Sequence, residues 1–186
     1  MSEEQNTIKP WVRLGSEMIA DCRVLKVQQT RSVSPLTHKE HSFYVFDTVD
    51  WVNVPITAAG EVVFVKQYRH GSDALSLEIP GGMVDEGELP IDAAARECLE
   101  ESGFRASRLT SLGVLNPNPA VFNNRLHTFL ATEVTQVGAI ANTATEETVV
   151  ELVRVSDLER LLVSGKVDHA LVAATLWRYL YFLQRS

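Results

Sequence analysis

Residues 82–104 read GMVDEGELPIDAAARECLEESGF, and this stretch tells more about the chain than any other. Gly82 is followed after five residues by Glu88 and, after seven more, by the pair Arg96-Glu97. Glu100, Glu101 and Gly103 close the run. Four carboxylates and one arginine at fixed offsets indicate a chemical site more than a chance acidic segment.

The second half of this stretch carries the signals of a helix. Pro90 suits the first turn, where its missing N–H costs nothing, and Ala93 to Ala95 favour helix. Gly103 can end the helix in the left-handed conformation. We expect one face of this helix, formed by Ile91, Ala95 and Cys98, to pack on the core. Cys98 on such a face is expected to be a small buried apolar residue and no nucleophile.

The glutamates of this helix gather on one side. At about 100° per residue, Glu97, Glu100 and Glu101 fall within roughly a third of the circumference. Like charges this close repel one another and would raise their own pKa values, a cost that a divalent cation removes. Oxygen ligands in this number suit Mg²⁺ or Mn²⁺. The alternative is a solvated acidic face, but Arg96 and the glycine-rich entry to the helix favour a site.

The same offsets resemble the Nudix box, G-x5-E-x7-R-E-U-x-E-E-x-G-U, where U is a bulky aliphatic residue and is replaced here by Cys98 and Phe104. The resemblance implies a Mg²⁺-dependent hydrolase of a nucleoside diphosphate linked to another group. It implies that Glu97 and Glu101 are the principal metal ligands and that Glu100 completes a second metal site or orients water. It also implies a bidentate ion pair between Arg96 and Glu88.

The entry loop Glu78-Ile79-Pro80-Gly81-Gly82 precedes the box. Two successive glycines allow backbone angles that other residues avoid and let the main chain approach a ligand. In the resembling family, a carbonyl at this point coordinates the metal, so Gly81 or Gly82 is expected to supply a neutral ligand. The alternative is a plain tight turn.

The segment Gln67-Tyr68-Arg69, with the Glu78 to Gly82 entry, resembles the branch of the family that hydrolyses ADP-ribose and other nucleoside diphosphate sugars. Arg69 is expected to meet a phosphate or the sugar, since guanidinium forks match phosphate oxygens. Its alternative is a surface salt bridge. Glu78 is expected to hold a ribose or backbone donors, or to pair with Arg69.

Two further segments are candidates for the site. Pro119 lies about 15 residues beyond the box, as in that branch, and Asn123, Asn124 and Arg125 follow it as substrate contacts or as loop structure. His127 is expected to be structural. The branch also carries a mobile acidic loop, so Glu146 is the first candidate and Glu147 the second for a distal metal ligand or general base. Their alternative is an exposed loop pair.

Composition fits one enzyme domain with a small appendage. The chain has 186 residues, of which 45% are apolar and 22% charged. The net charge of −7 argues against non-specific binding to nucleic acid or a membrane. No apolar run approaches about 18 residues, the amino terminus lacks a signal-peptide pattern, and two cysteines make no disulfide framework. We expect a cytoplasmic location.

Composition rich in β-formers, alternation at Val52, Val54 and Ile56 and a buried apolar run at 62–65 indicate strands. We expect strands at 22–34, 42–49, 52–56, 62–65, 75–79, 109–115, 125–132 and 148–155. A capping box beginning at Ser156 predicts a helix to Val163, and Asp168 is expected to cap a last helix through Leu183. The pattern is that of an α/β chain with a mixed sheet. The resemblance implies the Nudix α/β/α sandwich at 50–186, after an N-terminal β-hairpin subdomain at 1–49.

Relatives in the resembling branch commonly dimerise by exchanging N-terminal strands, so a homodimer is expected. Trp11 and Trp51 are then candidates to stack on a nucleobase, although such residues more often form an interface or core. The leading functional hypothesis is a nucleoside diphosphate sugar pyrophosphatase that yields a nucleoside monophosphate and a sugar phosphate.

Two alternatives stay open. The same chemistry can act on nucleoside triphosphates, dinucleoside polyphosphates or capped RNA, against which the acidic balance and the Gln67-Tyr68-Arg69 segment argue. A Nudix-fold sensor can bind the nucleotide without hydrolysis, but sensors tend to lose box carboxylates and this chain retains all four.

Overall fold

The computed structural model describes residues 8–140 and 147–185. The chain divides into two compact units, Met1–Thr48 with Asn118–Asn124, and Val49–Pro117 with Arg125–Ser186. The segment Asn118–Asn124 therefore groups with the N-terminal unit, an association that the sequence did not predict.

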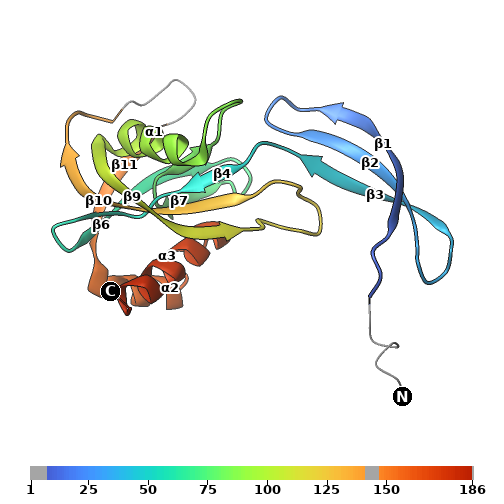
Figure 1. Cartoon of the computed structure of the whole chain (residues 1–186). Coiled ribbons are helices and arrows are strands. Elements are labelled where there is room, and N and C mark those ends of the chain that lie inside the picture. The colour runs from blue at the N-terminus through green and yellow to red at the C-terminus, as the bar shows by residue number, and fades with distance from the viewer. Residues whose placement is uncertain (1–7, 141–146, 186) are drawn as a thin grey trace, which may run out of the picture. The chain divides into compact units, whose positions relative to one another are not determined.

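The N-terminal unit is a three-stranded antiparallel sheet in the order β1-β2-β3 (Figure 1). Its strands are β1 (Val12–Asp21), β2 (Lys26–Val33) and β3 (Glu40–Asp47). The two strands expected at 22–34 and 42–49 correspond to β2 and β3. The sequence missed β1, because irregular pairing at Arg13/Gly15 and at Met18/Ala20 interrupts the alternation by which a strand is recognised.

The larger unit contains a mixed sheet of eight strands in the order β11-β6-β5-β10-β4-β8, with β7 paired to β6 and β9 paired to β10. Strand β10 runs parallel to β4 and β5, and the other pairs are antiparallel. The strands are β4 (Trp51–Asn53), β5 (Ile56–Ala58), β6 (Glu61–Arg69), β7 (Ala74–Glu78), β8 (Gly81–Met83), β9 (Phe104–Leu115), β10 (Leu126–Gln136) and β11 (Thr148–Arg154).

Helices cover both faces of this sheet. Helix α1 (Pro90–Ser102) lies on one face, and α2 (Leu158–Val163) and α3 (Ala170–Leu183) lie on the other (Figure 1). Strand β6 contributes to both apolar layers, since Val62 and Phe64 join the cluster around α2 and α3 while Val63 joins the cluster beneath α1. The expected α/β/α sandwich is confirmed. Within the described residues, no helix combines the length and the apolar character that a membrane crossing requires.

Helix α1 begins and ends as its sequence predicts, but its buried face is rotated. Pro90 stands at the start, and Gly103 ends the helix with φ of 72°. Ile91 and Ala95, expected in the core, are exposed, whereas Ala93 and Ala94 are fully buried with Cys98. The buried face of α1 is rotated because Glu97 and Glu101 are themselves buried, so the acidic ridge faces inward.

The capping predictions for the last two helices are wrong in detail. A single 3₁₀ turn, η2 (Val155–Asp157), precedes α2, and no side-chain cap is made there. The N-cap of α3 is His169, not Asp168, and it too makes no side-chain cap. Packing of Leu158, Leu161 and Leu176 in the core holds these helices instead.

Candidate active site

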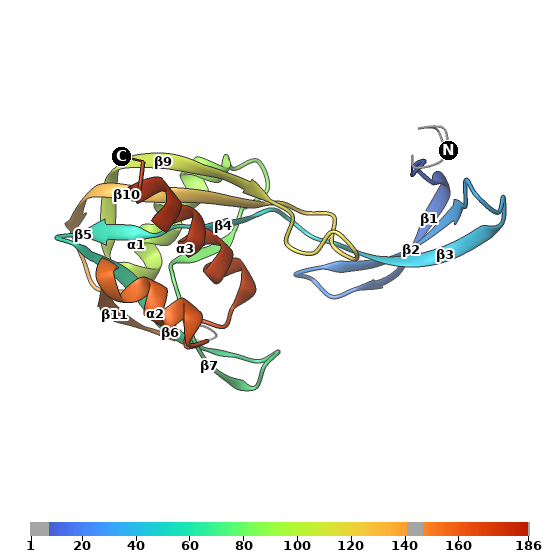
Figure 2. The same ribbon diagram turned by 90° about the horizontal axis from the view of Figure 1, so that it is seen from below.

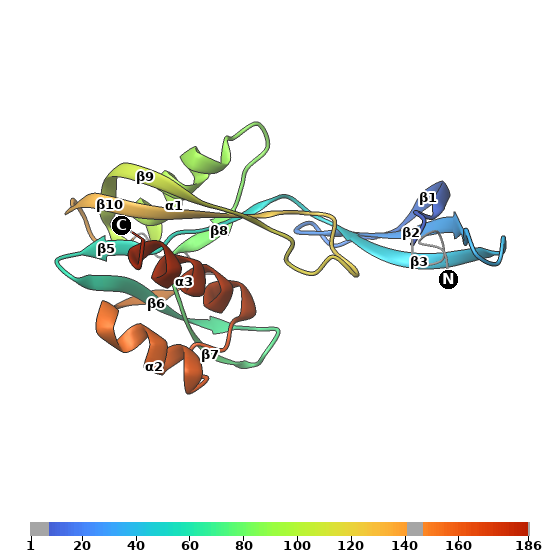
Figure 3. The ribbon, with the colours of Figure 1, turned by 60° about the horizontal axis from the view of Figure 1, so that its bottom comes forward.

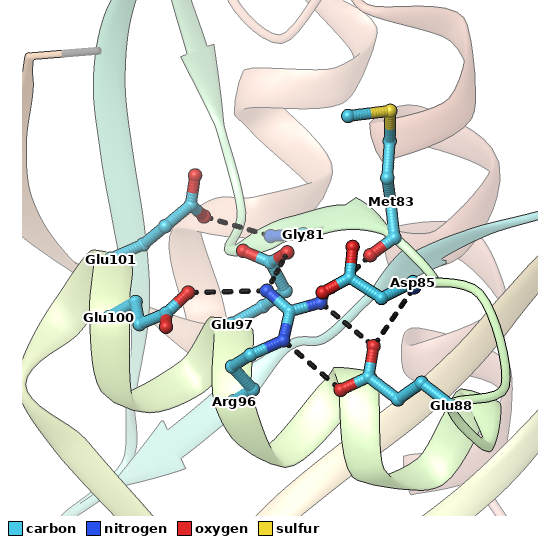
Figure 4. Close-up of polar contacts among 8 residues, drawn as sticks. All are labelled: Gly81, Met83, Asp85, Glu88, Arg96, Glu97, Glu100 and Glu101. Atoms are coloured by element: carbon cyan, nitrogen blue, oxygen red, sulfur yellow. Dashed lines mark hydrogen bonds and ion pairs between the residues drawn. The ribbon is translucent and has the colours of Figure 1, made fainter. Parts of the chain in front are cut away.

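Arg96 lies at the centre of a polar network on α1 (Figure 4). Its Nε and Nη2 atoms donate to the two oxygens of Glu88 at 3.1 and 3.0 Å, which is the predicted bidentate pair. Nη1 donates to Glu97 at 2.8 Å and to Glu100 at 3.2 Å, and Nη2 also donates to the Met83 carbonyl at 2.9 Å. The hydrogen bond to Glu88 contributes most to raising the pKa of Arg96. One guanidinium therefore joins the loop before α1, strand β8 and two carboxylates of the ridge.

Glu88 anchors the loop that leads into α1. The Asp85 N–H donates to its Oε2 atom at 3.0 Å, and the Glu88 N–H donates back to the Asp85 carbonyl at 3.0 Å. The hydrogen bonds from Arg96, and then from Asp85, lower the pKa of Glu88. A carboxylate with both oxygens committed in this way serves to hold Arg96 in position.

Glu97 and Glu101 lie against the two glycines of β8. They are 9% and 6% exposed, and the Gly81 N–H donates to Glu101 Oε2 at 2.9 Å (Figure 4). A Cβ atom at Gly82 would lie 2.6 Å from Cδ of Glu97, and one at Gly81 would lie 2.6 Å from Oδ1 of Asn53. Both glycines form strand, and neither has a positive φ. The expectation of unusual backbone angles is therefore wrong, and close packing explains the pair, of Gly82 against Glu97 and of Gly81 against Val52 and Asn53 of β4.

The carboxylates supply hard oxygen donors, but they are separated in this structure. Glu100 has a half-exposed side chain and is paired with Arg96. Across the described residues, no group of three acidic, histidine or cysteine side chains is arranged to hold a metal ion. The donor chemistry of Glu97 and Glu101, buried beside the β8 backbone, fits Mg²⁺ or Mn²⁺. Glu100 would have to turn from Arg96 to join them.

Cys98 is not placed to act as a nucleophile. The residue is fully buried, and burial, followed by the charges of Glu101 and Glu97, raises the pKa of its thiol to about 12. The thiol therefore stays protonated near neutral pH, and its predicted role as a small core residue is confirmed.

A cavity of about 720 Å³ adjoins this network. Of the predicted site residues it is lined by Trp51, Arg69, Glu78, Gly81, Gly82, Arg96 and Glu97. Its size suits a small-molecule ligand such as a nucleotide. Residues from β4, β6, β7, β8 and α1 are thus brought to one hollow from positions up to 46 residues apart, between Trp51 and Glu97.

Arg69 and Glu78 form a bidentate ion pair in the wall of this cavity. Nε and Nη2 of Arg69 each donate to one oxygen of Glu78 at 2.7 Å. Burial of Glu78, which is 3% exposed, acts to raise its pKa, but the hydrogen bonds and charge of Arg69 outweigh burial and the pKa lies below its ordinary value. Glu78 therefore pairs with Arg69, which was one of the roles expected for it, and Arg69 still borders the cavity.

Three predicted substrate contacts do not line this cavity. Asn123 and Asn124 belong to the N-terminal unit, where Asn123 bonds Asp47 at 2.6 Å and the Thr48 N–H at 3.3 Å. Arg125 bonds the side chain of Asn116 in the larger unit. These contacts correspond to the loop-structure alternative, and a role in binding substrate stays a prediction.

Trp11 lies in the N-terminal unit, packed edge-on against His41 and Phe43 at centroid distances of 5.5 and 5.2 Å. Glu147 is exposed immediately before β11, and Glu146 lies outside the described residues. Their roles in stacking and in base catalysis stay predictions. His127, expected to be structural, bonds Asp50 at 2.8 Å and holds the start of β10.

The sequence missed several polar residues of the cavity wall: Asn53, Ser76, Asp85, Asp168 and His169. Asn53 carried a readable signal, because it is a polar residue between two buried valines of a predicted strand. It donates from Nδ2 to Thr175 at 3.3 Å and so links β4 to α3. His169 carried no signal, since only the return of the chain after α2 brings it to the cavity.

Comparison with known proteins agrees with this architecture. The NUDIX domain model matches residues 47–175. A region of 79 residues is 35% identical to the ADP-ribose pyrophosphatase of Bacillus subtilis (strain 168), covering 42% of this chain and 43% of that protein. A region of 73 residues is 32% identical to the ADP compounds hydrolase NudE of Escherichia coli (strain K12), covering 39% of each. The matched regions thus span less than half the length of these two relatives.

Among solved structures, one described as the crystal structure of an ADP compounds hydrolase superposes with a TM-score of 0.86 over 96% of both chains at 20% identity, a likeness of fold. The family model covers well over half of the sequence, and it includes the Arg96 network and the cavity beside it. The chain belongs to the Nudix family.

Proposed function

We propose that the protein is a Mg²⁺-dependent Nudix hydrolase, active also with Mn²⁺, that cleaves the pyrophosphate bond of ADP-ribose-like nucleoside diphosphate sugars. The products are a nucleoside monophosphate and a sugar phosphate. One observation carries the proposal: the buried carboxylate Glu97, held by Arg96, faces the same cavity as Trp51 and Arg69. The carboxylates can bind the metal ion, the arginine can bind the negatively charged phosphates, and the tryptophan ring can stack on the nucleobase.

The residues of α1 would have two roles at the diphosphate: the glutamates bind the metal ion, and Arg96 holds a glutamate in position. Glu97, Glu100 and Glu101, with a carbonyl of Gly81 or Gly82, would hold Mg²⁺. The bound ion would neutralise phosphate oxygens and make an attacking water more acidic. Arg96 fixes the rotamer of Glu97 through its bond at 2.8 Å, whereas Glu100, bonded to Arg96 at 3.2 Å, would turn from it to join the ion. Glu88 in turn fixes Arg96, so Glu97 is positioned before substrate arrives.

The remaining contacts concern substrate. Arg69, already oriented by Glu78, meets a phosphate or the sugar from the β6 side of the cavity. Trp51 stacks on the nucleobase, a contact worth about 1–3 kcal/mol in nucleic-acid complexes. Trp11, Asn123, Asn124 and Arg125 are secondary candidates from outside the cavity wall. Glu146, or Glu147 next to it, is the candidate base.

A hydrolysis assay over a panel of nucleotide sugars, with Mg²⁺ and with chelator, tests the function. We expect ADP-ribose-like compounds to yield a nucleoside monophosphate and a sugar phosphate, detected by ³¹P NMR, only when the ion is present. Preferred cleavage of nucleoside triphosphates or capped RNA would point to the second hypothesis. Tight binding of ADP-ribose without any product would point to a sensor.

We also propose that the protein is a homodimer joined through its N-terminal sheet. The exposed apolar side chains of β1 and β3, among them Leu14, Met18 and Phe43, support this assembly. Light scattering at micromolar concentration should give twice the mass of the 20.7 kDa chain. A monomer under these conditions would remove the dimer from the account.

A further inference from the structure

The cavity has two walls of different chemistry. Strand β8 and helix α1 form the wall that contains Glu97 and Arg96, where the diphosphate is expected. The second wall comes from the β6–β7 hairpin and from Asp168, His169 and Leu171 at the start of α3. Figures 2 and 3 both place the N-terminal end of α3 beside this hairpin. Of the residues on this second wall, only Arg69 and Glu78 have a role in the proposed function.

His169 stands out on the second wall. The residue borders the cavity, yet its Nδ1 atom is enclosed and, within the part of the chain that the structure describes, has no hydrogen-bond partner. A buried polar atom without a partner costs free energy, and native proteins contain few of them. His169 also caps α3 with its backbone only, so the imidazole is not needed for that helix.

The ring can change its partners at little cost in packing. A half-turn about the Cβ–Cγ bond exchanges Nδ1 with a ring carbon and leaves the occupied space almost unchanged. The imidazole can therefore turn a nitrogen from its enclosed position toward a ligand. In its neutral form it offers one donor and one acceptor, which is what a hydroxyl group needs.

The neighbours of His169 suit a ligand that carries hydroxyl groups. Ser76 and Glu78 on β7 and Asp168 beside it line the same wall. The charge of His169 is among those that act to lower the pKa of Glu78, so the two side chains lie within electrostatic reach. Both oxygens of Glu78 are already bonded to Arg69. Asp168, Ser76 and the imidazole of His169 remain, and the hydroxyl groups of a ligand can donate to the Asp168 carboxylate and exchange hydrogen bonds with serine and imidazole.

We propose that His169 hydrogen-bonds the hydroxyl groups of the sugar attached beyond the diphosphate and thereby determines which group the enzyme accepts there. This inference rests on the proposed function, because that function places a diphosphate at the wall that contains Glu97 and Arg96. It assigns Trp51 to the base and the wall of Ser76 and His169 to the sugar.

Paired substrates test this assignment. ADP-ribose and the β-methyl ester of ADP carry the same nucleoside diphosphate, and only the first has a terminal sugar. His169→Ala should lower kcat/KM for ADP-ribose by about tenfold, the equivalent of one hydrogen bond, mainly through KM. It should change kcat/KM for the methyl ester by less than about twofold. His169→Gln, which retains a donor and an acceptor, should recover part of the loss.

His70→Ala is the matched control. This exposed histidine lies in the β6–β7 hairpin, contacts Tyr68 and does not line the cavity. It should leave both substrates unaffected. An equal loss on both substrates in His169→Ala would overturn the inference, since the ring would then support the fold or the diphosphate. No loss on ADP-ribose would overturn it as well.

A binding measurement separates this inference from the proposed function. The chain has five histidines, so their imidazole signals can be followed by NMR in metal-free protein, with His169→Gln to assign the signal. Ribose 5-phosphate should shift the His169 signal, and inorganic phosphate should not. If the wild-type protein hydrolyses no nucleotide sugar but this shift occurs, the proposed function fails and the sugar contact stands. If ribose 5-phosphate leaves the His169 signal unmoved, the sugar contact fails regardless of activity.

Discussion

Gly82 lies so close to Glu97 that a side chain at position 82 would collide with the carboxylate: an added Cβ atom would come within 2.6 Å of the Glu97 Cδ atom. Gly82→Ala must therefore displace this carboxylate or β8. We expect kcat to fall by at least about tenfold, because a misplaced ligand or positioning group costs far more in rate than in stability. Steady-state kinetics and thermal unfolding of the same variant measure the two effects.

Gly138→Ala is the control for this substitution, since a Cβ atom there meets nothing within 4 Å and φ is not positive. It should match the wild-type protein in both measurements. A wild-type kcat in Gly82→Ala would mean that the contact between Gly82 and Glu97 has no role in activity.

Arg96 should not tolerate lysine. Lysine keeps the charge but lacks the planar fork that pairs with both oxygens of Glu88 while also bonding Glu97. We expect Arg96→Lys to lower kcat/KM by about 10–100-fold, as loss of an outer-shell partner of a metal ligand does. It should lower the free energy of unfolding by about 1–3 kcal/mol. Chemical denaturation and kinetics on one preparation would show both, and unchanged values for both would refute the central role of this network.

Some features of the site could be predicted because they depend on local spacing alone. The helical period places Glu97 and Glu101 on one ridge, and Pro90 and Gly103 mark the ends of α1. The pair of Arg96 with Glu88 could be expected only from the family resemblance. Why the ridge faces inward could not be read locally, because it depends on β8 passing beneath α1.

Other features depend on long-range packing and were not predictable. Asn53 reaches the cavity because β4 pairs with β8 and contacts α3, and His169 reaches it because the chain returns there after α2. Strand β1 escaped recognition because its bulges break the two-residue period. Asn123 was expected to be a substrate contact or loop structure, and in the structure it bonds Asp47, while the neighbouring Phe122 pairs with Phe46 in the same N-terminal unit.

The pair of Arg69 and Glu78 should make stability depend on pH in the acid range. Because the pKa of Glu78 in the folded protein lies below its ordinary value of 4.5, the unfolded chain binds the proton more readily. The pair therefore stabilises the protein above about pH 4.5, and this contribution is lost as pH falls through the lowered pKa. Glu78→Gln should cost about 1–3 kcal/mol at pH 7, and the difference from wild type should shrink toward pH 3.

A surface pair provides the comparison for that experiment. Arg31 and Glu40 are bonded at 3.1 Å, but both side chains are about half exposed. Glu40→Gln should change the free energy of unfolding by less than about 0.5 kcal/mol at either pH. A constant difference between Glu78→Gln and wild type from pH 7 to pH 3 would contradict the linkage to Glu78.

Glu101 should matter to rate far more than to folding. Glu101→Gln keeps the shape and can still accept from the Gly81 N–H, a bond of 2.9 Å in the structure. It removes the charge that a metal ligand needs, so we expect kcat to fall more than about 100-fold with a normal circular dichroism spectrum. Near-normal turnover at saturating Mg²⁺ would refute the assignment.

Calorimetric titration with Mn²⁺ and Mg²⁺, in the presence and absence of ADP-ribose, tests the central claim most directly: that the carboxylates of α1 bind divalent ions beside a diphosphate. We predict saturable ion uptake by the wild-type protein that strengthens with the nucleotide sugar and is lost in Glu97→Gln and Glu101→Gln. Absence of uptake by the wild-type protein under every one of these conditions, or equal uptake by the two variants, would contradict it.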